Sequence, residues 1–347
     1  MMENDLSVRW KSPSNIALIK YWGKKENTQY PINPSLSMTL STCYTDTSIH
    51  LSPRSNNEND FEYFFEQKKL NITSSKLPSF FENFKKEHLW ANDYFFHIES
   101  KNTFPHSVGI ASSASSMSAL ALCLIDLDSQ ITGKYLNLQK VSSLAREGSG
   151  SACRSVYGGY SIWGNSSFHN SVDEYAKPFL NWEIHPIFQN MRDRILIVDT
   201  EGKKVSSTEG HCSMINHPYR NSRITQANNN LSTIIAAIKD GDFDTFAHVC
   251  ENEALSLHAL MMSSDLSYLL LESQSINIIE KLKNFREREN IKLCFTIDAG
   301  PNIHILYPEE QEDRINEFIE EELLTHCENS ISIQDQIGKG PEKVIND

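Results

Sequence analysis

The order in which strand-like and helix-like segments alternate constrains the fold of this 347-residue chain more than any other feature. Short runs of alternating or β-branched apolar residues dominate the first half, and helical spacing of apolar residues is strongest at 115–128. The second half is more helical, with two long patterns, 221–240 and 242–262, separated by Gly241. Hairpin-like strand spacing interleaved with helices predicts α+β layers rather than a doubly wound parallel sheet.

A change of composition near residues 181–192 is the candidate boundary between two domains, 1–187 and 188–347. Two domains agree with a usual size of about 100–200 residues per domain. Further strands are predicted at 6–10, 15–22, 36–40, 45–51, 61–66, 94–99, 157–163, 194–199, 292–297 and 302–307, and further helices at 79–88, 138–146, 276–289 and 311–324.

Charge and cysteine content narrow the class of protein. A formal net charge of −13 disfavours nucleic-acid binding, which needs a basic face, but permits a small anionic ligand held by local cations. The apolar runs are too short to cross a bilayer, and the acidic start lacks the order of a secretion signal. Seven scattered cysteines without a CxxC pair argue against a disulfide framework or a zinc site. We therefore expect a cytoplasmic protein that binds neither nucleic acid nor membrane.

A turn of small residues, Gly109-Ile-Ala-Ser-Ser-Ala114, leads directly into the 115–128 helix. Gly109 permits a sharp bend, and the first N–H groups of a helix point outward without partners. With the helix dipole they form an anion site, to which the hydroxyls of Ser112 and Ser113 can contribute. The alternative is simple capping of the helix by serine. The turn is neither a Walker A loop nor a dinucleotide fingerprint.

A second glycine- and serine-rich segment follows the 138–146 helix. Its amides and the hydroxyls of Ser149 and Ser151 can surround phosphate oxygens. The guanidinium of Arg154 is a planar fork that suits a carboxylate or a phosphate. The alternative is a flexible connection that carries a surface arginine.

Two strand ends carry charged side chains. Lys20 lies inside an apolar run, where an unpaired charge is costly, so we expect it to have an anionic partner. Tyr21 and Lys24 follow at the end of this strand and are candidate ligand contacts. The alternatives are that Tyr21 is a ring of the core and that Lys24 is a solvated surface charge. Asp298 ends another apolar strand pattern just before a Gly-Pro turn. Such an aspartate either forms the turn or acts as a rigidly held acid or base.

These segments, in this order, resemble the mevalonate diphosphate decarboxylase family of the GHMP small-molecule kinase superfamily. The run from Gly148 to Arg154, together with Asp298, is specific to the decarboxylase branch. The resemblance implies a two-domain GHMP-kinase-like fold, in which the active-site cleft lies between an N-terminal GHMP kinase-type ATP-binding domain and a C-terminal GHMP-type α+β domain. The matching segments are 15–24, 31–37, 109–114, 146–159, 205–208 and 298–302.

The resemblance also implies a reaction. ATP phosphorylates the tertiary 3-hydroxyl of mevalonate 5-diphosphate, and the 3-phosphate then leaves as the C1 carboxylate is lost as CO2. The products are isopentenyl diphosphate, ADP and phosphate. Mg²⁺ is expected to bridge the ATP phosphates rather than to occupy a cage of protein ligands. A homodimer is also expected, because dimers are common in the family.

Individual roles follow from the same resemblance. Asp298 matches a catalytic aspartate that orients or deprotonates the 3-hydroxyl, Lys20 is expected beside it, and Arg154 matches the arginine that holds the C1 carboxylate. Substrate contacts are implied for Tyr21, Lys24, Ser149, Ser151, Arg154, Ser207 and Thr208, and ATP contacts for Gly109, Ala111, Ser112, Ser113 and Lys203 or its neighbour Lys204.

Three positions depart from the usual family pattern: His106, Pro34 and His211, where threonine, serine and methionine are common. None of them removes a proposed catalytic group. Two alternatives stay open. One is a related GHMP enzyme that acts on mevalonate or mevalonate 5-phosphate, or that phosphorylates without decarboxylation. The other is a kinase-fold ligand sensor without catalysis, which would predict erosion at Asp298 or in the phosphate turn.

Overall fold

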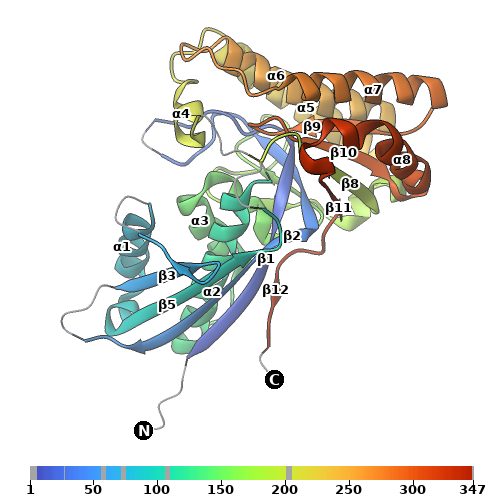
Figure 1. Ribbon diagram of the computed structural model, residues 1–347. Helices are drawn as coiled ribbons and strands as arrows, with labels where there is room; N and C mark the ends of the chain where they lie inside the picture. Colours follow the sequence, from blue (N-terminus) through green and yellow to red (C-terminus); the bar gives the residue numbers. More distant parts are fainter. Residues whose placement is uncertain are drawn as a thin grey trace.

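The computed structural model describes residues 6–26, 28–55, 60–71, 76–105, 110–200 and 205–345. Within these ranges the chain forms two β-sheets with helices packed against them, so the predicted α+β class is confirmed (Figure 1). Gly109 and Lys203, both predicted to contact ATP, lie outside the described residues, as do His106 and Lys204.

The first sheet has the strand order β12-β1-β2-β5-β3-β4, and β6 and β7 extend it from β2. Its two longest strands are antiparallel partners, β1 (Ser7–Ile19) and β2 (Ser35–Pro53). The other strands are β3 (Phe61–Phe65), β4 (Lys68–Lys69), β5 (Tyr94–Asn102), β6 (Tyr160–Trp163), β7 (Lys177–Pro178) and β12 (Glu342–Lys343).

The sheet differs from the sequence prediction in three places. The strands predicted at 6–10 and 15–22 are one strand, β1, and those predicted at 36–40 and 45–51 are parts of β2. A register shift between Pro13 and Asn15 lets the pairing continue across a bend. The segment from Lys20 to Trp22, predicted as strand, lies beyond the end of β1.

Three helices belong to this part of the fold: α1 (Leu77–Glu87), α2 (Ser112–Thr132) and α3 (Leu138–Gly148). The α2 helix packs on β1 and β2 and is buried along most of its length. Asn137 caps α3 by accepting hydrogen bonds from the N–H groups of Gln139 and Lys140. A 3₁₀ helix, Gly150–Val156, follows α3 directly and carries Arg154.

The second sheet has the order β11-β8-β10-β9, formed by β8 (Met191–Leu196), β9 (Cys294–Ile297), β10 (Ile303–Pro308) and β11 (Ser332–Gln336). The predicted helical hairpin is confirmed as α5 (Arg220–Asp240) and α6 (Phe243–Met262), which separate at Gly241 with a φ of 80°. The remaining helices are α4 (Ser207–Cys212), α7 (Ser273–Glu289) and α8 (Glu312–Phe318), the last continued by a π-helical turn, Ile319–Leu323.

The two parts are joined through a common core and through the C-terminal segment. Ile16 and Leu18 of β1 pack in one cluster with Ile195 of β8 and Ile235 of α5. After β11, the chain returns to the first sheet, where β12 pairs with β1 (Figure 1). The division at 187/188 therefore stays a prediction, since the sequence beyond it contributes to both sheets. No helix in the described ranges is long and apolar enough to span a membrane.

Candidate active site

A cleft of about 680 Å³ lies where the two parts meet. Its walls come from the end of β1, the start of α2, the segment after α3, the short helix α4, and the turn after β9. That volume lies in the usual range for small-molecule sites. The predicted site residues that line it are Lys20, Tyr21, Lys24, Ala111, Ser113, Ser149, Ser151, Arg154, Ser207, Thr208 and Asp298.

Lys20 and Asp298 form an ion pair at the bottom of this cleft. Lys20 Nζ lies 2.8 Å from Asp298 Oδ1, and the two side chains are 2% and 24% exposed. Lys20 therefore has the anionic partner that we expected, because an unpaired charge at the end of an apolar strand is costly. Because Asp298 follows β9 in the second sheet and Lys20 follows β1 in the first, the pair connects the two parts of the fold.

Arg154 is buried beside this pair. Its Nε donates to Asn15 Oδ1 at 3.3 Å and its Nη1 donates to Ser35 Oγ at 2.6 Å, while the ring of Trp163 lies 5.9 Å from the guanidinium carbon. Desolvation lowers the pKa of Arg154, although an arginine keeps its charge at neutral pH. These two acceptors are neutral, so the cationic fork suits an anionic ligand entering the cleft.

The start of α2 and the end of α3 lie next to each other in the wall of the cleft. Ala111 precedes α2 in the left-handed conformation, with a φ of 46°, and turns the chain into the helix. Ser113 Oγ lies 3.3 Å from Ser149 Oγ, so the two glycine- and serine-rich segments of the sequence are neighbours. Ser112 is the first residue of α2 and is not among the residues that line the cleft.

Tyr21 lines the cleft next to the Ser149–Ser151 segment. Its ring packs edge-on against Trp163 at 4.7 Å and is tilted over His211 at 4.4 Å. Burial raises the pKa of the Tyr21 phenol, and its hydroxyl has no hydrogen-bond partner among the described residues. A Cβ atom at Gly150 would lie 2.6 Å from this hydroxyl, so only glycine lets Tyr21 approach the Ser149–Ser151 segment.

Ser207 and Thr208 are the first two residues of α4 and line the cleft. Ser206 and Glu209 form a reciprocal capping box that fixes the start of this helix. Thr208 Oγ1 accepts a hydrogen bond from Lys76 Nζ at 3.1 Å, a contact made across the cleft from the start of α1. His211, one of the departures from the family pattern, accepts a hydrogen bond from the Gly23 N–H at its Nδ1, at 2.9 Å.

Lys24 stands at the mouth of the cleft. Partial burial, reinforced by the nearby positive charge of Lys76, lowers the pKa of Lys24 to about 8. The ammonium donates to Gln29 Oε1. Lys24 is therefore a cation that loses its charge only slightly above neutral pH.

Sequence analysis missed three residues of this site. Lys76 lies in a polar stretch without a motif, and no local signal identifies it. The sequence predicts Asn15 only as part of a strand, although an amide side chain within an apolar strand needs a hydrogen-bond partner there. His258 donates from Nε2 to the Asp298 carbonyl at 3.0 Å, and a polar residue on an apolar helix face was its only signal. In the described ranges, no three His, Cys, Asp or Glu side chains gather as a metal site.

Fold and cleft together define a two-domain α+β protein of the GHMP type, with a cationic cleft that suits phosphorylated small molecules. Comparison with known proteins makes this more specific. Residues 12–174 match the diphosphomevalonate decarboxylase-like N-terminal domain, and residues 194–344 match the mevalonate 5-diphosphate decarboxylase C-terminal domain. The chain belongs to the diphosphomevalonate decarboxylase family.

Three relatives illustrate the similarity. Diphosphomevalonate decarboxylase of Schizosaccharomyces pombe is 30% identical over an alignment of 359 residues, gaps included. The alignment covers 96% of this chain and 86% of that protein. The crystal structure of mevalonate diphosphate decarboxylase from Staphylococcus aureus is 30% identical, with a TM-score of 0.85 over 99% of this chain and 100% of that one. A structure of MDDEF in complex with MVAPP, AMPPCP and magnesium is 27% identical, with a TM-score of 0.83 over 98% and 99% of the two chains.

The lowered pKa of Lys24 predicts pH-dependent binding of a diphosphate. The ammonium is present below about pH 8 and is lost as the pH rises through that value, so affinity falls with rising pH. We expect the dissociation constant for methyl diphosphate to rise about tenfold between about pH 7 and about pH 9.5. Calorimetric titration measures it. Lys24→Arg, which stays charged, is the control and should show a flat profile. A flat profile for the unsubstituted protein would contradict the assignment.

Proposed function

We propose that this cleft catalyses the ATP-dependent decarboxylation of mevalonate 5-diphosphate to isopentenyl diphosphate, a step of isoprenoid biosynthesis by the mevalonate pathway. The observation that carries the proposal is the Lys20–Asp298 pair, which lines the same cleft as Arg154 and the start of α2. This reaction needs three groups: a carboxylate that acts on the alcohol, a guanidinium that binds the substrate carboxylate, and a helix N-terminus that binds phosphates.

The first chemical step is transfer of the terminal phosphoryl group of ATP to the 3-hydroxyl. A tertiary alcohol is a poor nucleophile, so a base that orients it and accepts its proton accelerates the transfer. Asp298 supplies that carboxylate, and Lys20 Nζ at 2.8 Å supplies a neighbouring positive charge that favours its ionised form. The proton of the hydroxyl passes to Asp298 as the new P–O bond forms and ADP leaves.

The second step is loss of phosphate and CO2. The C3–O bond breaks with the departure of phosphate, and the electron pair of the C1–C2 bond becomes the new double bond as CO2 is released. Arg154 holds the C1 carboxylate in the orientation that lets both bonds break together, a positioning effect. The guanidinium donates hydrogen bonds to Asn15 and Ser35, which fix its position for this role.

We propose that the two polyphosphate groups bind in neighbouring parts of the cleft, which meet where Ser113 Oγ lies 3.3 Å from Ser149 Oγ. Tyr21, Lys24, Ser149, Ser151, Ser207 and Thr208 bind the substrate, and Gly109, Ala111, Ser112, Ser113 and Lys203 bind ATP. The serine hydroxyls and the Asp298 carboxylate are hard oxygen donors of the kind that accompany Mg²⁺ in phosphate sites. When bound with ATP, Mg²⁺ neutralises charge that develops on the transferred phosphate.

The protein's setting is also part of the proposal. We infer a cytoplasmic location, which is supported by seven cysteines that are all unpaired thiols. We infer a homodimer from the resemblance to the family.

The direct test is incubation of the protein with ATP, Mg²⁺ and mevalonate 5-diphosphate. We expect equal amounts of CO2, isopentenyl diphosphate, ADP and phosphate. Parallel incubations with mevalonate and mevalonate 5-phosphate should give little turnover. ADP release without CO2 would instead indicate a kinase, and preference for a shorter substrate would contradict the assigned substrate.

Asp298→Asn removes the base and leaves the shape of the site nearly unchanged. We expect kcat to fall by about 10³-fold or more, while calorimetry still detects binding of mevalonate 5-diphosphate at a similar affinity. Near-normal turnover would remove Asp298 from the mechanism.

Arg154→Met removes the guanidinium and keeps much of its volume. Because Arg154 binds the carboxylate in the ground state and also orients it for bond breaking in the transition state, we expect KM to rise and kcat to fall, each by about tenfold or more. Circular dichroism checks that the variant is folded. An unchanged kcat would refute the role of Arg154 in orienting the carboxylate.

A further inference from the structure

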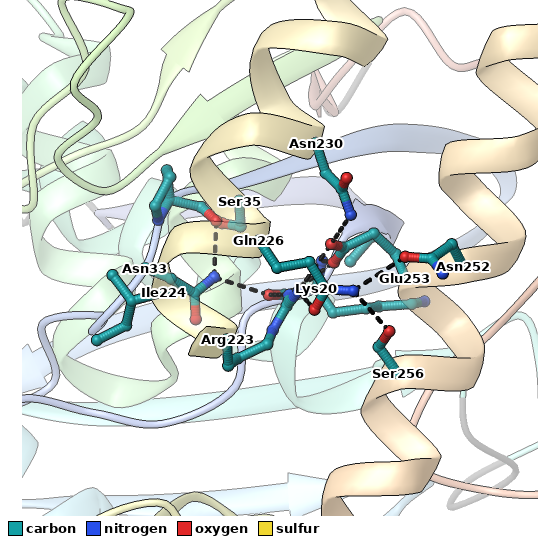
Figure 2. Close-up of polar contacts among 12 residues, drawn as sticks. Lys20, Asn33, Ser35, Arg223, Ile224, Gln226, Asn230, Asn252, Glu253 and Ser256 are labelled. Carbon is teal, nitrogen blue, oxygen red and sulfur yellow. Dashed lines mark hydrogen bonds and ion pairs between the residues drawn. The ribbon is translucent and has the colours of Figure 1, made fainter. Parts of the chain in front are cut away.

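Both backbone hydrogen-bonding groups of Lys20 are held by side chains (Figure 2). The Lys20 N–H donates to Glu253 Oε2 at 2.9 Å, and the Lys20 carbonyl accepts from Arg223 Nη2 at 3.1 Å and from Asn33 Nδ2 at 3.0 Å. Lys20 directly follows the last residue of β1. These side chains thus occupy groups that would otherwise continue the ladder with β2, and they fix where Lys20 leaves the sheet.

Arg223 of α5 and Glu253 of α6 form a two-pronged ion pair behind Lys20 (Figure 2). The distances are 2.7 Å from Nη1 to Oε1 and 2.6 Å from Nη2 to Oε2, and the two side chains are 1% and 0% exposed. Asn230 Nδ2 also donates to Glu253 Oε1 at 2.7 Å, and Gln226 Oε1 accepts from Arg223 Nη1 at 3.1 Å. The pair is therefore held in one orientation by its neighbours.

Stability alone does not account for this pair. A fully buried ion pair is rarely more stable than apolar side chains of the same volume, because both charges lose their water. Arg223 Nε adds to that cost, since it is buried without a hydrogen-bond partner among the described residues. The pair directs one donor and one acceptor at the backbone of Lys20, which indicates that positioning Lys20 is its task.

The same helix also holds the partner of Lys20. His258, about 7.5 Å beyond Glu253 along the axis of α6, donates from Nε2 to the Asp298 carbonyl at 3.0 Å. Burial lowers the pKa of His258 to about 4, so the ring is neutral and this hydrogen bond persists at neutral pH. One rigid helix therefore sets the backbone of Lys20 and the backbone of Asp298 relative to each other.

We propose that Arg223 and Glu253 are positioning residues, which hold Lys20 at hydrogen-bond distance from Asp298 for transfer of the phosphoryl group. The proposal rests on the function assigned above. Neither side chain is among the residues that line the cleft, so their loss leaves substrate contacts in place. A displacement of about 1 Å at a reacting group costs about 10²-fold in rate, so the effect falls on kcat.

The test compares two double variants. Arg223→Met with Glu253→Leu removes the pair without leaving a lone buried charge. Arg286→Met with Glu251→Leu is the control, a less buried pair whose side chains are 28% and 10% exposed. It removes a two-pronged pair with distances of 2.6 Å and 3.3 Å that also starts from α6 but ends on α7 instead of contacting Lys20. Arg223→Lys is a milder third variant that keeps the charge and loses the planar fork.

Two measurements are made on each protein: hydrogen exchange of the Lys20 amide, and kcat and KM for mevalonate 5-diphosphate. In the Arg223/Glu253 variant we expect Lys20 exchange to be at least about tenfold faster, because its N–H has lost a buried acceptor. We expect kcat to fall about 30–100-fold, with KM changed by less than about threefold. Arg223→Lys keeps Glu253, the acceptor of the Lys20 N–H, so we expect a smaller fall in kcat without a marked change in Lys20 exchange. The control pair should show neither effect.

Unchanged exchange at Lys20 in the Arg223/Glu253 variant, unchanged kcat in that folded variant, or equal losses in the control pair would each overturn the proposal. If this double variant does not fold, Arg223→Lys decides by kcat and KM, and an unchanged kcat would overturn the proposal. If the unsubstituted protein does not turn over mevalonate 5-diphosphate, the proposed function fails. The exchange comparison still shows whether the pair fixes Lys20.

Discussion

The ion pair between Lys20 and Asp298 is the constraint around which the rest of the structure is arranged. Its two members follow strands of different sheets, and they meet at 2.8 Å only because the two parts of the fold share a core. On the Lys20 side, Asn33, Arg223 and Glu253 hold the backbone. On the other side, the α6 helix reaches Asp298 through His258. A relative motion of the two parts would separate the pair, so the proposed mechanism depends on the interface between them.

The cleft is rich in positive charge, although the chain as a whole is negatively charged. The protein carries a net charge of −13, yet Lys20, Lys24, Lys76 and Arg154 all line one pocket. Local cations in a partly dehydrated site outweigh a distant negative field that solvent screens. The same dehydration lowers the pKa of Lys24 to about 8, so the site loses positive charge as the pH rises through that value.

Much of the fold follows from local patterns. The α5–α6 hairpin with its break at Gly241 is visible in the sequence, because helical spacing and a left-handed glycine are local properties. Two short C-terminal strands, β11 and β12, were missed. Glu342 and Lys343 have no strand pattern of their own, and their conformation comes from pairing with β1. The single strand β1 was predicted as two, because only its long partner β2 shows that pairing continues across the bend.

The sequence by itself determined the α+β class, the family and many of the residues that line the cleft, because these depend on residue types in a fixed order. It also required that Lys20 have an anionic partner, since a charge in an apolar strand end is costly. The family resemblance suggested Asp298 as that partner, and the tertiary structure shows the contact between two residues more than 270 positions apart. The tertiary structure alone brought in Lys76, His258 and the Arg223–Glu253 pair, since distances between segments remote in sequence are set by packing and leave no local pattern.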